Sequence, residues 1–91
     1  MKTSEIKKQF NEYSQAFCFD ELTIDEYVAK MNAIATPIGQ VREEVEDLDE
    51  DNVQEIDRYD ATTCNGEEFF CVLYKVRTES GASYFAYGLD D

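Results

Sequence analysis

The spacing of apolar residues predicts two amphipathic helices at the start of the chain. After Thr3 or Ser4, either of which can cap a helix, apolar side chains recur three or four positions apart at Ile6, Phe10, Tyr13 and Phe17. Thr23 and Glu26 then form the pattern of a capping box, and it opens a second apolar stripe of Ile24, Tyr27, Val28, Met31 and Ile34. Pro37 disfavours helical geometry at the residue before it, so we expect this helix to end by about residue 35.

A third helix is predicted to begin at Thr36 and Pro37, because a capping residue followed by proline is typical of a helix start. Apolar residues then recur at helical spacing, with acidic residues between them, at Ile38, Val41, Val45 and Leu48. The pattern predicts a third helix with an apolar inner face and an acidic outer face, which ends near residues 49–52 because Asp and Asn continue a helix poorly. Apolar and acidic residues also alternate at Val41, Glu43 and Val45, so a strand is the alternative.

The second half of the chain has the alternation and the turn residues of an antiparallel sheet. The pair Asn65-Gly66 predicts a two-residue type I′ hairpin between a strand within 53–64 and a strand over 67–77. The second of these is apolar on both faces, as a central strand is, and a turn at 79–82 leads to a third strand over 83–89. We therefore expect an α+β fold, with two to three N-terminal helices packed on one face of a three-stranded antiparallel β-meander.

Length and composition favour one folded domain that spans residues 1–91. Hydrophobic residues make up 43% of the chain, and six Phe and six Tyr make it too apolar for a disordered acidic tail. The opening residues contain no apolar signal segment, and no apolar run reaches the ~20 residues that span a bilayer, so we expect a cytoplasmic protein without membrane contact. Cys18, Cys64 and Cys71 lack the spacing and the histidines of a zinc site, so we expect reduced thiols.

The charge of the chain sets the strongest constraint on its partners. Its 21 acidic and 8 basic residues give a net charge of −13, which repels nucleic acid and anionic membranes and attracts basic proteins. Ten of the eighteen residues from Glu43 to Asp60 are acidic. Repulsion between like charges on a helix costs a few tenths of a kcal/mol per i,i+4 pair, which favours a binding surface over a merely solvated face. The candidate partner-binding residues are Glu43, Glu44, Glu46, Asp47, Asp49, Glu50, Asp51, Glu55 and Asp57.

The expected helical spacing suggests what such a surface could bind. Acids three or four positions apart on a helix project their charges at steps of about 5–6 Å. Duplex DNA presents one negative charge per ~1.7 Å of axis over two strands, so a row of carboxylates can act as a DNA mimic. A protein that grips phosphates with Lys and Arg is therefore the expected partner.

The residue types of the chain give little support for catalysis or for cofactor binding. The chain has no histidine, which removes the commonest general base and metal ligand. Carboxylate pairs such as Glu67 and Glu68 arise by chance among 21 acids, so we expect no enzyme and no cofactor. Asp47, Asp49 and Asp51 match the opening of a calcium loop, but the sixth position is Asn52 instead of glycine and the twelfth, which needs glutamate, is Arg58.

In size, charge, acidic run and order of helices and hairpins, the chain resembles the small acidic inhibitors that phages encode, the anti-CRISPR and anti-restriction proteins. This resemblance in composition and layout implies an inhibitor that occupies the basic DNA- or RNA-binding cleft of a bacterial defence complex in the host cytoplasm. One alternative is an immunity protein that neutralises a basic nuclease toxin. Another is a regulatory or assembly subunit without inhibitory activity, which binds through an aromatic sheet face made of Phe69, Tyr74, Tyr84, Phe85 and Tyr87.

Overall fold

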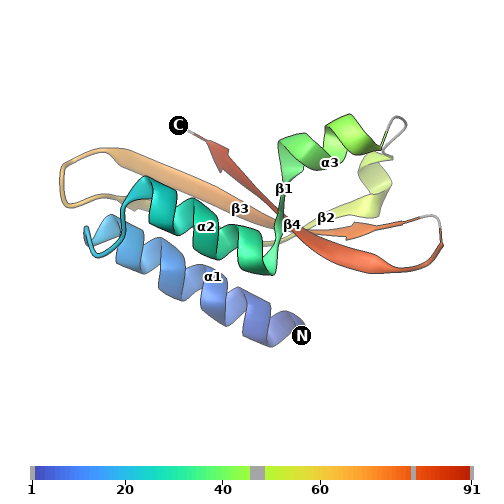
Figure 1. Cartoon of the computed structure of the whole chain (residues 1–91), viewed down its shortest axis with the longest axis horizontal. Coiled ribbons are helices and arrows are strands. Elements are labelled where there is room, and N and C mark those ends of the chain that lie inside the picture. Colours follow the sequence, from blue (N-terminus) through green and yellow to red (C-terminus); the bar gives the residue numbers. More distant parts are fainter. Residues whose placement is uncertain (1, 46–48, 79, 91) are drawn as a thin grey trace.

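The fold is α+β, as the sequence predicts (Figure 1). The structure, a computed structural model, describes residues 2–45, 49–78 and 80–90. In chain order its elements are α1 (Thr3–Cys18), α2 (Ile24–Ile34), β1 (Thr36–Pro37), α3 (Ile38–Glu44), the 3₁₀ turn η1 (Glu50–Asn52), β2 (Val53–Thr62), β3 (Glu68–Arg77) and β4 (Ser83–Asp90).

Helices α1 and α2 form where the apolar stripes predict them. The capping box is confirmed: the Thr23 backbone N–H donates to Glu26 Oε1 at 3.0 Å, and the Glu26 N–H donates to Thr23 Oγ1 at 3.2 Å. Two details of the prediction are wrong. Ile24 is 48% exposed because it lies in the first turn, ahead of the buried part of the stripe. The N-cap position of α1 is Lys2, without a side-chain cap, because the helix already includes Thr3.

Within the described residues the sheet has four strands in the order β1-β4-β3-β2, so the predicted three-stranded meander is incomplete. Strands β2, β3 and β4 do pair in antiparallel fashion, but β1 adds a parallel pairing in which Thr36 lies opposite Ala86 and Pro37 opposite Tyr87. Proline forces extended geometry on the residue before it and is tolerated at a sheet edge, where its missing N–H breaks no ladder. The same proline that ends α2 therefore creates a short strand.

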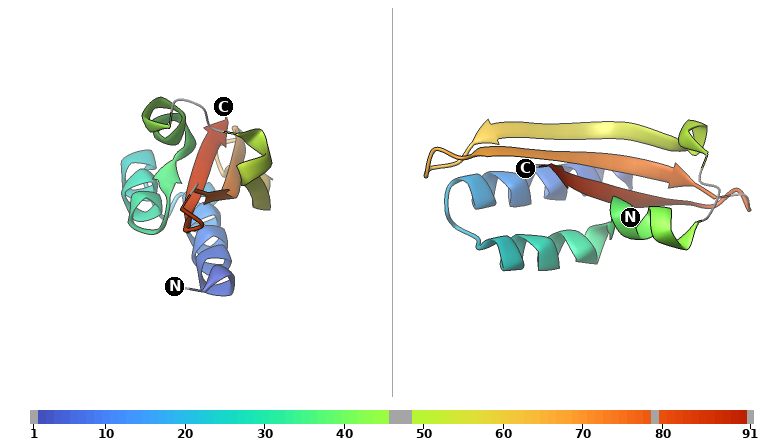
Figure 2. Two further views of the ribbon diagram at one scale, coloured as in Figure 1. Left: turned by 90° about the vertical axis from the view of Figure 1, so that its right-hand side faces the viewer. Right: turned by 90° about the horizontal axis from the view of Figure 1, so that it is seen from above.

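Helices cover both faces of the sheet, not one face as predicted (Figure 2). The inner face, which α1 and α2 cover, holds the first core, whose buried sheet residues are Phe69, Cys71, Leu73 and Tyr87. The outer face holds a second, smaller core, in which Val41 of α3 packs with Val76 and Ala86. Gly88 on β4 permits this approach, since a Cβ there would lie 3.2 Å from Cγ2 of Ile38. Strand β1 carries the chain from one face to the other at the β4 edge.

Helix α3 is shorter than the apolar period predicts, and the strand alternative is also wrong over 41–44. The helix ends at Glu44, and Val45, which we expected to face inward, is extended and 39% exposed. The fourth residue of the predicted stripe, Leu48, lies outside the described residues. A helix this short depends on tertiary packing, and Val41 is its buried residue. Repulsion between the acidic residues that follow in the sequence disfavours a longer helix.

The hairpin between β2 and β3 uses a different turn from the predicted type I′. Gly66 has a positive φ of 84°, but Asn65 does not share it. The Gly66 N–H donates to the Thr63 carbonyl at 3.0 Å, and the Thr63 N–H donates to the Glu67 carbonyl at 2.8 Å. This is the three-residue loop in which a type I turn is followed by a left-handed glycine. In the β3–β4 hairpin, Gly81 likewise has a positive φ, of 87°, and its N–H donates to the Thr78 carbonyl at 3.0 Å.

Candidate functional site

The structure gathers five of the nine candidate acids at one end of the molecule, which we call the acidic end (Figure 1). Glu43 and Glu44 occupy the last turn of α3, and the other three belong to the turn η1 or cap it. All five are exposed: Glu43, Glu44, Asp49, Glu50 and Asp51. Two further candidates, Glu46 and Asp47, lie outside the described residues.

Local packing positions both carboxylate-bearing elements of the acidic end. Val41 anchors α3 in the second core, and Val53, directly after η1, packs against the same core. The Asp49 side chain accepts a hydrogen bond from the Asp51 backbone N–H at 3.0 Å, which caps the turn. Val41 and Val53 therefore hold α3 and η1 against the sheet, while the carboxylates of both elements are exposed to solvent.

The acids of this end do not form the continuous helical row that the sequence predicts. Because α3 ends at Glu44, the acids of η1 stand on a separate element near the start of β2. The two elements lie on different sides of the sheet end, as the views in Figure 2 agree. The negative charge is therefore spread across the end of the sheet and does not follow one helix axis.

Two cations that the sequence did not place there lie close to one part of the acidic end. Lys75 and Arg77, from the end of β3, line a shallow groove of about 360 Å³ together with Asp51. No ion pair joins Asp51 to either cation in the described part of the chain. The strand register brings Lys75 near Asp51, because Lys75 pairs with Gln54, which lies three residues after Asp51. The field of the acidic end is thus weaker on this side.

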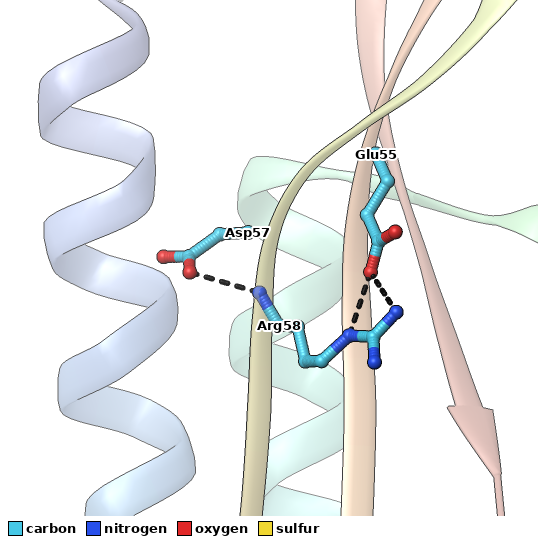
Figure 3. A network of polar contacts seen from close by, with 3 residues as sticks. All are labelled: Glu55, Asp57 and Arg58. Atoms are coloured by element: carbon cyan, nitrogen blue, oxygen red, sulfur yellow. Dashed lines mark hydrogen bonds and ion pairs between the residues drawn. The ribbon is translucent and has the colours of Figure 1, made fainter.

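Glu55 and Asp57, the two candidates on β2, are engaged in contacts within the protein (Figure 3). Both Nε and Nη2 of Arg58 lie 2.8 Å from Glu55 Oε1, an ion pair that neutralises this carboxylate. Asp57 is half-buried, and its Oδ2 accepts a hydrogen bond from Asn11 Nδ2 of α1 at 2.8 Å. The structure therefore does not bring these two residues together with the acidic end.

A β-bulge explains why Glu55 and Asp57 point to opposite faces although they are two positions apart. Glu55 pairs with Tyr74 on β3 and Asp57 pairs with Leu73, so the residue between them is the extra one. The bulge turns Asp57 toward α1 and leaves Glu55 on the outer face, where Arg58 also lies over the ring of Phe70 at 5.4 Å. On a regular strand, residues two positions apart point to the same face, so the sequence alone does not reveal this change of face.

The five aromatics that we considered as one binding face are divided between the two faces of the sheet. Phe69 and Tyr87 are buried in the first core, and Phe85 packs against it. Tyr74 and Tyr84 pack on the second core under α3. Adjacent positions on a strand point to opposite faces, so the grouping of Tyr84 with Phe85 was wrong. An aromatic sheet face of this composition does not exist.

The titratable groups with the largest pKa changes lie in the first core, away from the acidic end. Burial raises the pKa of the Cys71 thiol to about 11, and burial likewise raises the pKa of Tyr27. Tyr27 OH shares a buried hydrogen bond of 2.9 Å with Ser14 Oγ between the two helices. This hydrogen bond links α1 to α2.

Over residues 2–45, 49–78 and 80–90, no three Cys, Asp or Glu side chains gather as metal ligands. No helix in this part of the protein is long and apolar enough to cross a membrane. No protein-family model matches the chain, and neither a curated protein nor a solved structure matches it.

Proposed function

We propose that this protein is a small inhibitor whose acidic end binds a basic nucleic-acid-binding surface of a bacterial defence complex, such as a CRISPR effector or a restriction enzyme. Binding there blocks access of DNA or RNA to the Lys and Arg residues that would contact phosphates. The observation that supports the proposal is a group of five exposed carboxylates, none of which forms an ion pair with another described residue. Such carboxylates are available for cations on a partner.

The distribution of these carboxylates refines the mode of binding. Two groups of acids on separate elements complement a basic cleft by charge, without copying the regular spacing of phosphates along one strand. Long-range attraction of this kind accelerates association and is screened by salt, with a Debye length of ~8 Å at physiological ionic strength. The complex is therefore expected to form fast and to weaken steeply as salt increases.

A charge-matched pair of variants tests the proposal. The first variant neutralises the acidic end through Glu43→Gln, Glu44→Gln, Glu50→Gln and Asp51→Asn. The control removes the same number of charges from exposed positions outside this end, through Glu12→Gln, Glu21→Gln, Glu67→Gln and Glu68→Gln. Each protein is immobilised and exposed to a bacterial lysate that carries CRISPR and restriction systems, and captured complexes are then purified and titrated.

We expect the native chain and the control to capture the same nucleic-acid-binding complex, from which DNA or added salt displaces them. Loss of even one desolvated charge pair costs at least about 2 kcal/mol, so the acidic-end variant should bind that complex at least about 30-fold more weakly. Equal affinity of the two variants would refute the role of the acidic end. Capture of a nuclease toxin in place of a defence complex would identify an immunity protein that uses the same surface.

A further inference from the structure

The end of α1 and the β2–β3 hairpin meet at the opposite end of the sheet from the acidic end (Figure 1). Cys18 is the last residue of α1, and Cys64 lies in the hairpin loop. The Cys64 backbone N–H donates a hydrogen bond of 2.9 Å to the Cys18 carbonyl oxygen. Both cysteines also line the same surface pocket of about 220 Å³. Two cysteines that are distant in the sequence are thus neighbours in the fold.

The backbone contact fixes a separation that suits a disulfide. With standard bond lengths, a direct N–H···O=C bond between two residues brings their Cα atoms to about 5–6 Å. Disulfides span Cα separations of about 4.4–6.8 Å. Cys71, the third cysteine, is fully buried on the inner face of β3 and lines no surface pocket with the other two. The geometry therefore singles out one pair of the three.

The two thiols differ in access in the way that stepwise oxidation requires. Cys64 is exposed and open to a reagent in solution, whereas Cys18 is 5% exposed and reaches the surface through the shared pocket. Burial raises the pKa of the Cys18 thiol, and the neighbouring Cys64 raises it further. The exposed thiol is thus the one that a disulfide reagent meets first, and the buried thiol is placed to resolve the adduct.

We propose that Cys18 and Cys64 form a reversible disulfide that clamps α1 to the β2–β3 hairpin when a low-molecular-weight disulfide such as oxidised glutathione is present. The Cys64 thiolate attacks one sulfur of oxidised glutathione, which forms a mixed disulfide and releases one glutathione thiolate. Cys18 then gives its proton to that thiolate and attacks the Cys64 sulfur, which expels the second glutathione. Two protein thiols are oxidised, and one molecule of oxidised glutathione is reduced to two of glutathione.

Peptide mapping of the whole chain tests the proposal directly. The native protein is incubated with oxidised glutathione, alkylated under denaturing conditions and digested with trypsin and a glutamate-specific protease, which together separate Cys64 from Cys71. We expect a crosslinked pair of peptides that carry Cys18 and Cys64, while Cys71 is recovered as the alkylated thiol. Because the bond closes a long loop of the unfolded chain, the Tm should rise by about 10 °C or more, and reductant should reverse the rise.

The matched control is Cys64→Ser, an exposed loop substitution that leaves the first core intact. Its Tm before oxidation should equal that of the reduced native protein, and oxidised glutathione should not raise it. A native protein that keeps a glutathione adduct on Cys64, forms dimers linked through Cys64, or remains fully reduced would overturn the proposal.

Discussion

The two cores of this protein differ in what holds them together. In the part of the chain that the structure describes, the first core, between the inner face and helices α1 and α2, contains ten buried residues. It includes a cluster of aromatic rings in which the ring centroids of Phe17 and Phe69 lie 4.9 Å apart. Among the described residues, the second core, under α3, contains three that are buried: Val41, Val76 and Ala86. The same sheet thus carries a densely packed layer on one face and a lightly packed one on the other.

This difference shows how the chain accommodates its charge. Acidic residues replace apolar ones around α3, so this helix has little to bury, and its stability comes from the sheet on which it rests. Segments with few buried contacts open at a lower free energy than the global unfolding free energy. We infer that the first core stabilises the whole fold, while the acidic end is the part that opens most readily.

The largest effect is expected from truncation in the first core. Phe10 is fully buried, so Phe10→Ala should lower the free energy of unfolding by about 3–5 kcal/mol, through lost burial and the cavity that remains. Urea unfolding followed by circular dichroism measures this loss. The matched control is Phe19→Ala, since Phe19 is 59% exposed and its truncation should change stability by less than about 0.5 kcal/mol. Similar losses in both variants would contradict the assignment of the first core.

Alkaline pH should weaken the first core next. Cys71 loses its proton near pH 9.0 in the unfolded chain, but burial raises its pKa to about 11 in the folded protein. Its contribution to stability is complete below pH 9.0 and falls as the pH rises toward about 11, by about 2–3 kcal/mol in total. Urea unfolding at a series of pH values measures this slope. In Cys71→Ala the slope should be smaller, and an unchanged slope would assign the alkaline loss to other groups.

The second core should show the smallest effect on the whole fold and the most local one. Val41→Ala removes the buried residue of α3 and should lower the free energy of unfolding by about 2 kcal/mol at most. In hydrogen exchange, the Val45 amide, which donates to the Val41 carbonyl, should lose protection, while amides of α1 and α2 keep theirs. Equal loss of protection in all three helices would show that the two cores unfold as one unit.

The elements that local patterns encode were predictable from the sequence. The stripes of α1 and α2, the capping box at Thr23 and the strands β3 and β4 each depend on residues that are close in the chain. The pairing of β1 with β4 and the outer position of α3 were not predictable, because both depend on contacts between distant segments. The end of α3 was missed because spacing alone does not show whether a partner exists for Val45.

The sequence predicted which residue types make up the candidate site but not how they are arranged in space. The acidic run is visible in the sequence, yet those of its members that the structure describes are spread over three different elements. The bulge between Glu55 and Asp57 has no local signal, and neither does the hydrogen bond from Asn11 that engages Asp57. Charge density identifies the region, whereas side-chain partners identify which charges are free to bind.

Because β1 pairs with β4, the sheet cannot be completed until the end of the described chain has been synthesised. Strand β4 follows the other elements in the chain, yet in the sheet it lies between β1 and β3. During synthesis, both helical layers therefore leave the ribosome before the strand that they share exists. Until β4 arrives, the first core lacks Tyr87 and the second core lacks Ala86, and nascent chains stalled before Ser83 should be degraded rapidly.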